Sequence, residues 1–164
     1  MIAVAIISVL AMLVVPSFIR ESRKTKSSTE VTPMLAELAT KEQQYKQETG
    51  SFLDAAACPT TPSQSEQDIT STCLASTTAW TTMRVQPHSL KLRCRYTIKT
   101  GAAATNPSST TPLSAATWVQ SVPSSQAESW FYILAECDAN GNGTYAQFFQ
   151  ASWDTRIQKY NEGE

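Results

Sequence analysis

Four cysteines and one histidine are the residues of this chain that most readily carry metal or redox chemistry. The histidine is His88, no Cys-x-x-Cys spacing occurs, and the cysteines are Cys58, Cys73, Cys94 and Cys137. Zinc sites are usually built from closely spaced cysteine and histidine ligands, so this spacing argues against zinc. Two disulfides formed in an oxidising compartment explain the cysteines better.

Four cysteines allow three pairings, of which we favour Cys58 with Cys73 and Cys94 with Cys137. The first bond would close a loop that is rich in proline, serine and threonine and has little core of its own. The second would join two apolar segments that are predicted strands. Four reduced, buried thiols are the alternative, because free cysteine packs like a small apolar side chain.

The segment DANGNG carries oxygen-bearing side chains at alternate positions, Asp138, Asn140 and Asn142, as in the first half of a calcium-binding loop. The last position of such a loop is normally a glutamate that binds the ion through both oxygens, and here it is Phe149. Asn-Gly pairs are also frequent in hairpin turns. We therefore predict a turn without a metal, and these three residues are the alternative calcium ligands.

No catalytic motif accompanies these residues. His88 has no nucleophile or carboxylate motif nearby, and neither G-x-S-x-G nor a phosphate-binding glycine loop occurs in the sequence. We predict no enzymatic activity and no cofactor. The net charge of -1 gives no general attraction to nucleic acid. The basic residues that alternate along one predicted strand form a basic stripe, which comprises Lys91, Arg93, Arg95 and Lys99. Such a stripe could contact DNA or an acidic polysaccharide. We expect instead that it is a solvated face or that it pairs with acidic residues.

Residues 1–19 carry no charge. As a helix they would span roughly 28 Å, close to the hydrocarbon thickness of a bilayer. A secretory signal peptide would have a basic start, a shorter apolar run and a small-residue cleavage site, which are lacking. The pattern predicts a helix that lies in lipid or is buried against other helices.

The helix is predicted to continue as an amphipathic helix to a stop at Gly50, which gives about 49 residues. Pro16 and Pro33 lie within it and predict a bend or local unwinding at one or both. The apolar positions of its second half recur at helical spacing. They are Val31, Met34, Leu35, Leu38 and Tyr45.

The remainder of the chain, 51–164, is predicted to form a globular head. Apolar and polar residues alternate strictly over 90–99, which indicates a strand with one buried and one wet face. Residues 130–137 and 144–152 predict a hairpin, whereas 101–126 reads as a surface connection. Three antiparallel strands packed on the helix of residues 1–50 would form an α+β fold with one core.

These features together resemble the type IV pilin family. The run MIAVAIISVLAMLVVPSFIR is close to the family's N-terminal signature in composition and in the placement of Pro16 before a basic run. YKQETGSF resembles the family's helix exit, and DANGNG and the closing NEGE resemble pilin-like proteins of myxobacteria. The resemblance implies a long helix whose apolar half protrudes and whose amphipathic half packs on a small antiparallel sheet.

The function that the resemblance implies is structural: a type IV pilus subunit that polymerises through its apolar helix, for surface adhesion or twitching motility. The implied partners are further copies of the chain, other pilins, an inner-membrane assembly platform and a prepilin peptidase acting on the precursor. The subunit would lie in the inner membrane before assembly and in the extracellular filament afterwards. The implied filament-packing residues are Ile2, Val4, Ile6, Ile7, Val9, Leu10, Leu13, Val14, Pro16 and Phe18.

Family members begin with a basic leader, a cleavage site and a Phe-Thr-Leu-Ile-Glu-type start, none of which is found here. We expect such a segment upstream of Met1, and no residue of this chain takes the role of the family's assembly glutamate. A basic leader would also offset the basic residues 20–26, which by themselves favour a cytoplasmic head. Two alternatives stay open: a pseudopilin or minor pilin of a type II secretion-like machine, and a membrane-anchored periplasmic binding module that does not polymerise.

Overall fold

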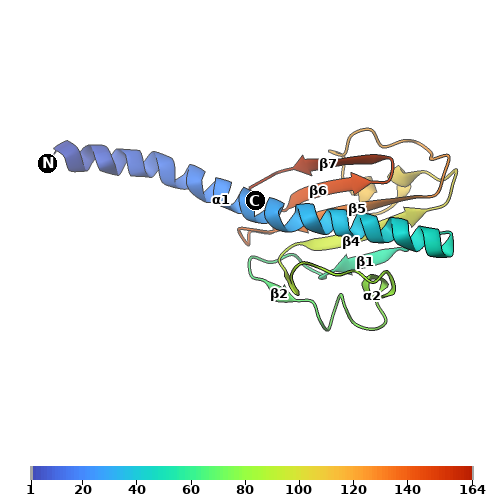
Figure 1. The fold of residues 1–164 in the computed structure, drawn as a ribbon. Coiled ribbons are helices and arrows are strands. Elements are labelled where there is room, and N and C mark those ends of the chain that lie inside the picture. The colour runs from blue at the N-terminus through green and yellow to red at the C-terminus, as the bar shows by residue number, and fades with distance from the viewer. Residues whose placement is uncertain (1, 164) are drawn as a thin grey trace.

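The computed structural model describes the backbone of residues 2–163 and the side chains of Phe18 and residues 21–163. A long helix, α1 (Ile2–Thr49), packs against a five-stranded antiparallel sheet, so the α+β arrangement is as predicted (Figure 1). The chain leaves the helix at Gly50, whose φ is 85° and whose N–H donates to the Lys46 carbonyl at 2.7 Å. Glycine adopts this left-handed conformation without steric cost, and the predicted stop is confirmed.

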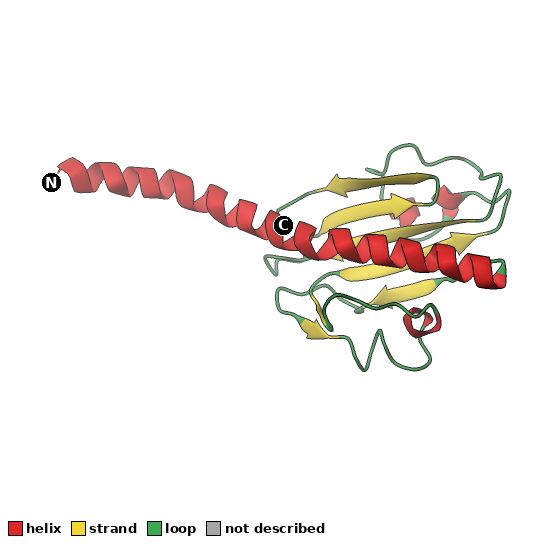
Figure 2. Ribbon diagram, in the orientation of Figure 1, coloured by secondary structure: helices red, strands yellow, loops and turns green. Residues whose placement is uncertain are grey.

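The two prolines within α1 do not break it. The helix continues through both Pro16 and Pro33, and Figure 2 shows that it curves gently along its length. Of the two predicted outcomes, local unwinding is therefore wrong over Ile2–Thr49, whereas the gentle curvature is in keeping with a bend. Each proline removes one backbone donor, and a long helix absorbs that loss through slight curvature.

The main sheet has the strand order β1-β4-β5-β6-β7, and every neighbouring pair is antiparallel. The predicted hairpin is confirmed as the pairing of β5 with β6, whereas the outer strands β1 and β7 were not predicted. A separate two-stranded sheet joins β2 to β3. The strands are β1 (Ala55–Cys58), β2 (Gln67–Asp68), β3 (Lys91–Leu92), β4 (Arg95–Gly101), β5 (Trp130–Cys137), β6 (Ala146–Ala151) and β7 (Asp154–Tyr160). The short helices are α2 (Ala79–Thr82), η1 (Pro107–Ser109) and η2 (Leu113–Ala115).

The strand predicted over 90–99 is divided in two. β3 ends at Leu92 and β4 begins at Arg95, because the N–H groups of Arg93 and Cys94 donate to the carboxylate of Glu30 on α1. The predicted burial holds for four of the five apolar positions, Leu92, Cys94, Tyr96 and Ile98. Leu90 is 54% exposed and is the exception.

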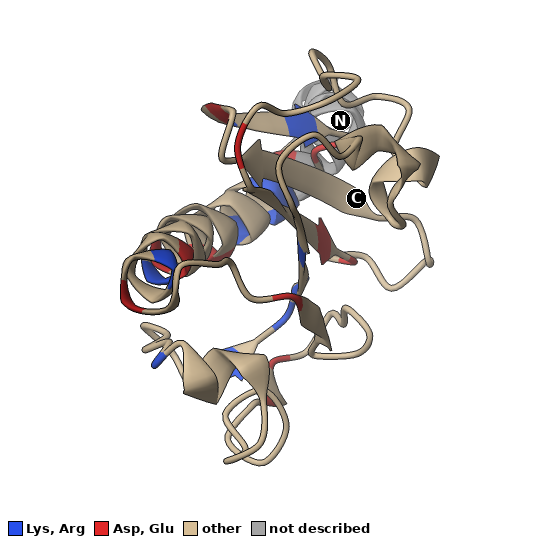
Figure 3. Ribbon diagram, turned by 90° about the vertical axis from the view of Figure 1, so that its right-hand side faces the viewer, with Lys and Arg blue, Asp and Glu red and all other residues tan. Residues whose placement is uncertain are grey.

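The main core lies between α1 and one face of the sheet. Figure 3, viewed along α1, shows the helix on one side of the strands. Val31, Leu35 and Leu38 are fully buried there. The sheet contributes large apolar side chains, which include Tyr96, Ile98, Phe131, Ile133 and Phe148. Burial of this stripe fixes the second half of α1 to the head.

A second core covers the opposite face of the sheet. Trp130, Tyr132 and Phe149 pack there against Leu113, which comes from η2. The Leu113 N–H also donates to the Tyr132 hydroxyl at 3.3 Å. Both faces of β5 and β6 are therefore covered, unlike the strand over 90–99, for which one wet face was predicted. The connection over 101–126, predicted to be a surface loop, instead supplies part of the core.

Candidate functional site

The cysteines form the two predicted disulfides, Cys58–Cys73 and Cys94–Cys137. The first ties the end of β1 to the loop before α2, and the second joins the start of β4 to the end of β5. No free cysteine occurs in the part of the chain that the structure describes. The cysteines are therefore structural crosslinks.

The predicted calcium ligands form a turn with their own backbone. One carboxylate oxygen of Asp138 accepts from Gly141 N–H at 2.7 Å and the other from Gly143 N–H at 3.1 Å. The Asn140 side-chain oxygen accepts from Asn142 N–H at 2.9 Å, and that of Asn142 accepts from Thr144 N–H at 2.7 Å. Among the described residues no group of three or more His, Cys, Asp or Glu is placed to hold a metal ion. The side-chain oxygens stabilise the loop between β5 and β6.

The basic stripe is largely neutralised within the chain. Arg93 pairs with Glu66 at 2.8 Å, and Lys99 pairs with Asp54 at 2.6 Å. Arg95 forms an ion pair with Glu136 on the neighbouring strand β5. The basic residues of the stripe therefore serve mainly to pair with acidic residues of the same chain, on the sheet and beside it. His88 is exposed in the loop before β3 and lines a pocket together with Lys91 and Arg93.

Most of the predicted filament-packing residues, Ile2 to Pro16, lie outside the described side chains. Phe18 is described, and 72% of its surface is exposed. Within the described residues we find no helix that is long and apolar enough to cross a membrane. The predicted span of residues 1–19 falls almost entirely outside that search.

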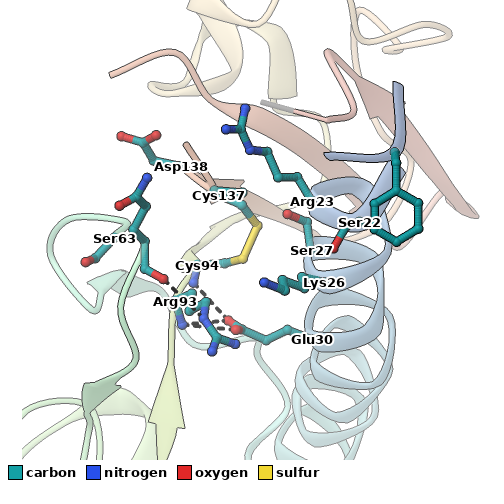
Figure 4. A pocket seen from close by; sticks show the side chains of 13 residues that line it. Ser22, Arg23, Lys26, Ser27, Glu30, Ser63, Arg93, Cys94, Cys137 and Asp138 are labelled. Carbon is teal, nitrogen blue, oxygen red and sulfur yellow. Dashed lines mark hydrogen bonds between the residues drawn. A yellow bond between two sulfur atoms is a disulfide. The ribbon is translucent and has the colours of Figure 1, made fainter. Parts of the chain in front are cut away.

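A pocket of about 340 Å³ lies where α1 meets the head (Figure 4). The helix contributes Phe18, Ser22, Arg23, Lys26 and Ser27 to its wall. The head contributes the Cys94–Cys137 disulfide together with side chains of the two flanking loops. The pocket adjoins the point at which α1 continues toward its uncharged segment.

Among the described residues of α1, Glu30 accepts the most hydrogen bonds from the head. Its carboxylate accepts hydrogen bonds from the N–H groups of Arg93 at 3.0 Å and Cys94 at 2.8 Å, and from the Tyr96 hydroxyl at 3.2 Å. Burial raises the pKa of Glu30 above its usual value, although these hydrogen bonds act in the opposite direction. Burial also raises the pKa of Tyr96, with a further contribution from the Glu30 charge.

A second buried acid, Glu42, lies three turns further along α1. Its carboxylate accepts from the Leu53 N–H at 3.0 Å, and burial is the main cause that raises its pKa to about 7. Glu30 and Glu42 were not predicted from the sequence, although each lies four residues from a buried apolar residue of the same helix face, Met34 and Leu38 respectively. An acid on the apolar stripe of a helix was the signal that could have revealed them.

Comparison with protein-family models, with curated proteins and with solved structures gives no match. A proposal about the function of this chain must therefore rest on its own residues and their geometry.

Proposed function

We propose that this chain is the structural subunit of a type IV pilus-like filament and polymerises through its uncharged N-terminal helix. The observation that carries the proposal is the continuity of α1. Its second half is fixed on the sheet by a buried stripe, and the same helix extends beyond the sheet to Ile2 (Figure 1). That extension coincides with the uncharged run of residues 1–19.

An apolar helix that leaves its own domain requires an external partner. Each Å² of apolar surface removed from water contributes about 25 cal/mol, so a bundle of such helices would be strongly cohesive. Lipid meets the same requirement before assembly. The buried stripe and the contacts of Glu30 hold the head firmly to the helix, and the Cys94–Cys137 disulfide crosslinks β4 and β5 within the head, which suits a subunit that transmits load.

Surface fibres sheared from the producing cells provide the test. We expect the chain in the sheared fraction, as polymers that dissociate only in denaturant. Leu10→Lys would place a charge in the helix bundle and should abolish the fibres. Leu90→Lys is the matched control, because Leu90 is 54% exposed on the head and should tolerate the same change.

Three results would decide between the interpretations. Fibres that persist in the Leu10→Lys variant would contradict assembly through the helix. A wild-type chain that remains monomeric in the membrane fraction would favour a tethered binding module. A chain that reaches the periplasm-facing secretion machinery, but not the cell surface, would favour the pseudopilin alternative.

A further inference from the structure

The pocket at the junction of α1 and the head contains two basic side chains that have no acidic partner among the residues whose side chains are described. Arg23 and Lys26 both extend from the helix into the pocket wall, Arg23 on the Cys137 side of the disulfide and Lys26 on the Cys94 side (Figure 4). Neither takes part in any ion pair among the described residues. Two cations at one pocket repel each other and favour the binding of an anion.

The two acids that line the same pocket, Glu30 and Asp138, accept hydrogen bonds from backbone N–H groups, and among the described residues neither forms an ion pair with Arg23 or Lys26. The Glu30 carboxylate accepts hydrogen bonds from the backbone N–H groups of Arg93 and Cys94, which precede β4. Asp138 accepts hydrogen bonds from the amides of its own turn. Arg93, a third cation of the wall, is already paired with Glu66. Arg23 and Lys26 are therefore the cations of this pocket that remain available to an anion.

Neutral and apolar groups complete the lining. Ser22, Ser27 and Ser63 bring hydroxyl groups that can donate to an oxyanion. Phe18 lines the pocket as well, and it belongs to the uncharged run that precedes the basic residues. Cations, hydroxyl donors and an aromatic ring in one pocket suit a phosphate group that carries an apolar tail.

We propose that this pocket binds the phosphate of an anionic phospholipid, with Arg23 and Lys26 as its charged ligands, while the uncharged run lies in the membrane. The inference rests on the proposed function, which puts that run in lipid before assembly. Arg23 lies four residues beyond Ile19, about one helical turn, which corresponds to the depth of the headgroups. Basic residues at that depth attract anionic lipid.

Native mass spectrometry of the full chain in neutral detergent micelles tests the proposal. Phosphatidylglycerol and phosphatidylcholine with the same acyl chains are added separately. We expect one phosphatidylglycerol to bind roughly tenfold more tightly than phosphatidylcholine. The double variant R23Q/K26Q should bind both lipids equally, and R23K/K26R should retain the preference.

A charge-matched control separates the pocket from net charge. K41Q/R84Q removes two positive charges at positions that do not line the pocket, and it should keep the tenfold preference. Near-ultraviolet circular dichroism checks that every variant is folded. Absence of any preference in the wild type, or an equal loss in both double variants, would overturn the proposal.

The source of the phosphate is tested by competition. Inorganic phosphate at millimolar concentration should displace little lipid, because it lacks the tail that contacts the apolar part of the pocket. Full displacement by phosphate alone would overturn the lipid assignment in favour of a soluble anion. The filament assay is independent: lipid preference without fibres contradicts only the filament, and fibres without lipid preference contradict only the lipid site.

Discussion

The carboxylate of Glu42 on α1 accepts a hydrogen bond from the backbone N–H of Leu53 at 3.0 Å. The contact ties the end of the helix to the chain that follows it. The Glu42 side chain is fully buried, and its Oε1 has no hydrogen-bond partner among the described residues. Burial, assisted by the nearby charge of Asp54, raises the pKa of Glu42 from 4.5 to about 7.

We predict that the protein loses stability as the pH rises from 4.5 toward 7. The folded state binds the Glu42 proton more tightly than the unfolded state does. The stabilisation is therefore complete below the unfolded pKa and is lost as the pH passes through the folded pKa. The loss should be about 3 kcal/mol once the pH exceeds the folded pKa.

Glu42→Gln should flatten this part of the pH profile, because glutamine keeps the acceptor for Leu53 but cannot ionise. Urea unfolding of both proteins in micelles at several pH values between 4.5 and 8 measures the difference. Parallel profiles for the two proteins would show that Glu42 does not titrate in this range.

Removal of the Glu30 carboxylate should be costly. Glu30→Ala leaves the N–H groups of Arg93 and Cys94 without their acceptor, and we expect a loss of about 3 kcal/mol in unfolding free energy. Glu37→Ala is the control on the same helix, since its single bond to Gln86 N–H is exposed and should contribute less than about 1 kcal/mol. Equal losses, measured by urea unfolding, would rule out a special role for Glu30.

The two disulfides should differ in their contribution to stability. Cys94–Cys137 closes a loop with a sequence separation of 43, against 15 for Cys58–Cys73. In the chain-entropy account the longer loop is worth about 4 kcal/mol and the shorter about 3 kcal/mol. The double variants C94A/C137A and C58A/C73A, compared by urea unfolding, should follow that order. A larger loss for the shorter loop would point to native-state packing as the main cause.

Because the connection over 101–126 supplies part of the second core, we predict that a substitution in this connection lowers the stability of the protein. Leu113→Ala in η2 should cost about 3 kcal/mol, because the side chain is buried against Tyr132 and Phe149. Leu90→Ala is the comparison, and its 54% exposed side chain should make the change nearly neutral. Thermal unfolding in micelles would report both changes. A neutral Leu113→Ala would mean that the connection is only loosely attached to the sheet.

Local patterns were sufficient for the elements whose partners are near in sequence. The apolar spacing of Val31 to Leu38 predicted the packed face of α1, Gly50 predicted its end, and the alternation of apolar runs around DANGNG predicted the β5–β6 hairpin. Both cystine pairs also followed from the sequence, since each was expected to close a poorly packed loop or to join two strands.

The sequence by itself determined the uncharged N-terminal run, the helix that continues it and the central hairpin, because periodicity and turn chemistry act over a few residues. Only the tertiary structure decided that the 101–126 connection covers the sheet, that Glu30 divides the predicted strand over 90–99, and that Arg23 and Lys26 share a pocket with a disulfide. Those outcomes depend on contacts between residues far apart in the chain, such as the 64 positions from Glu30 to Cys94, and no local pattern specifies which polar side chain will satisfy a distant backbone group.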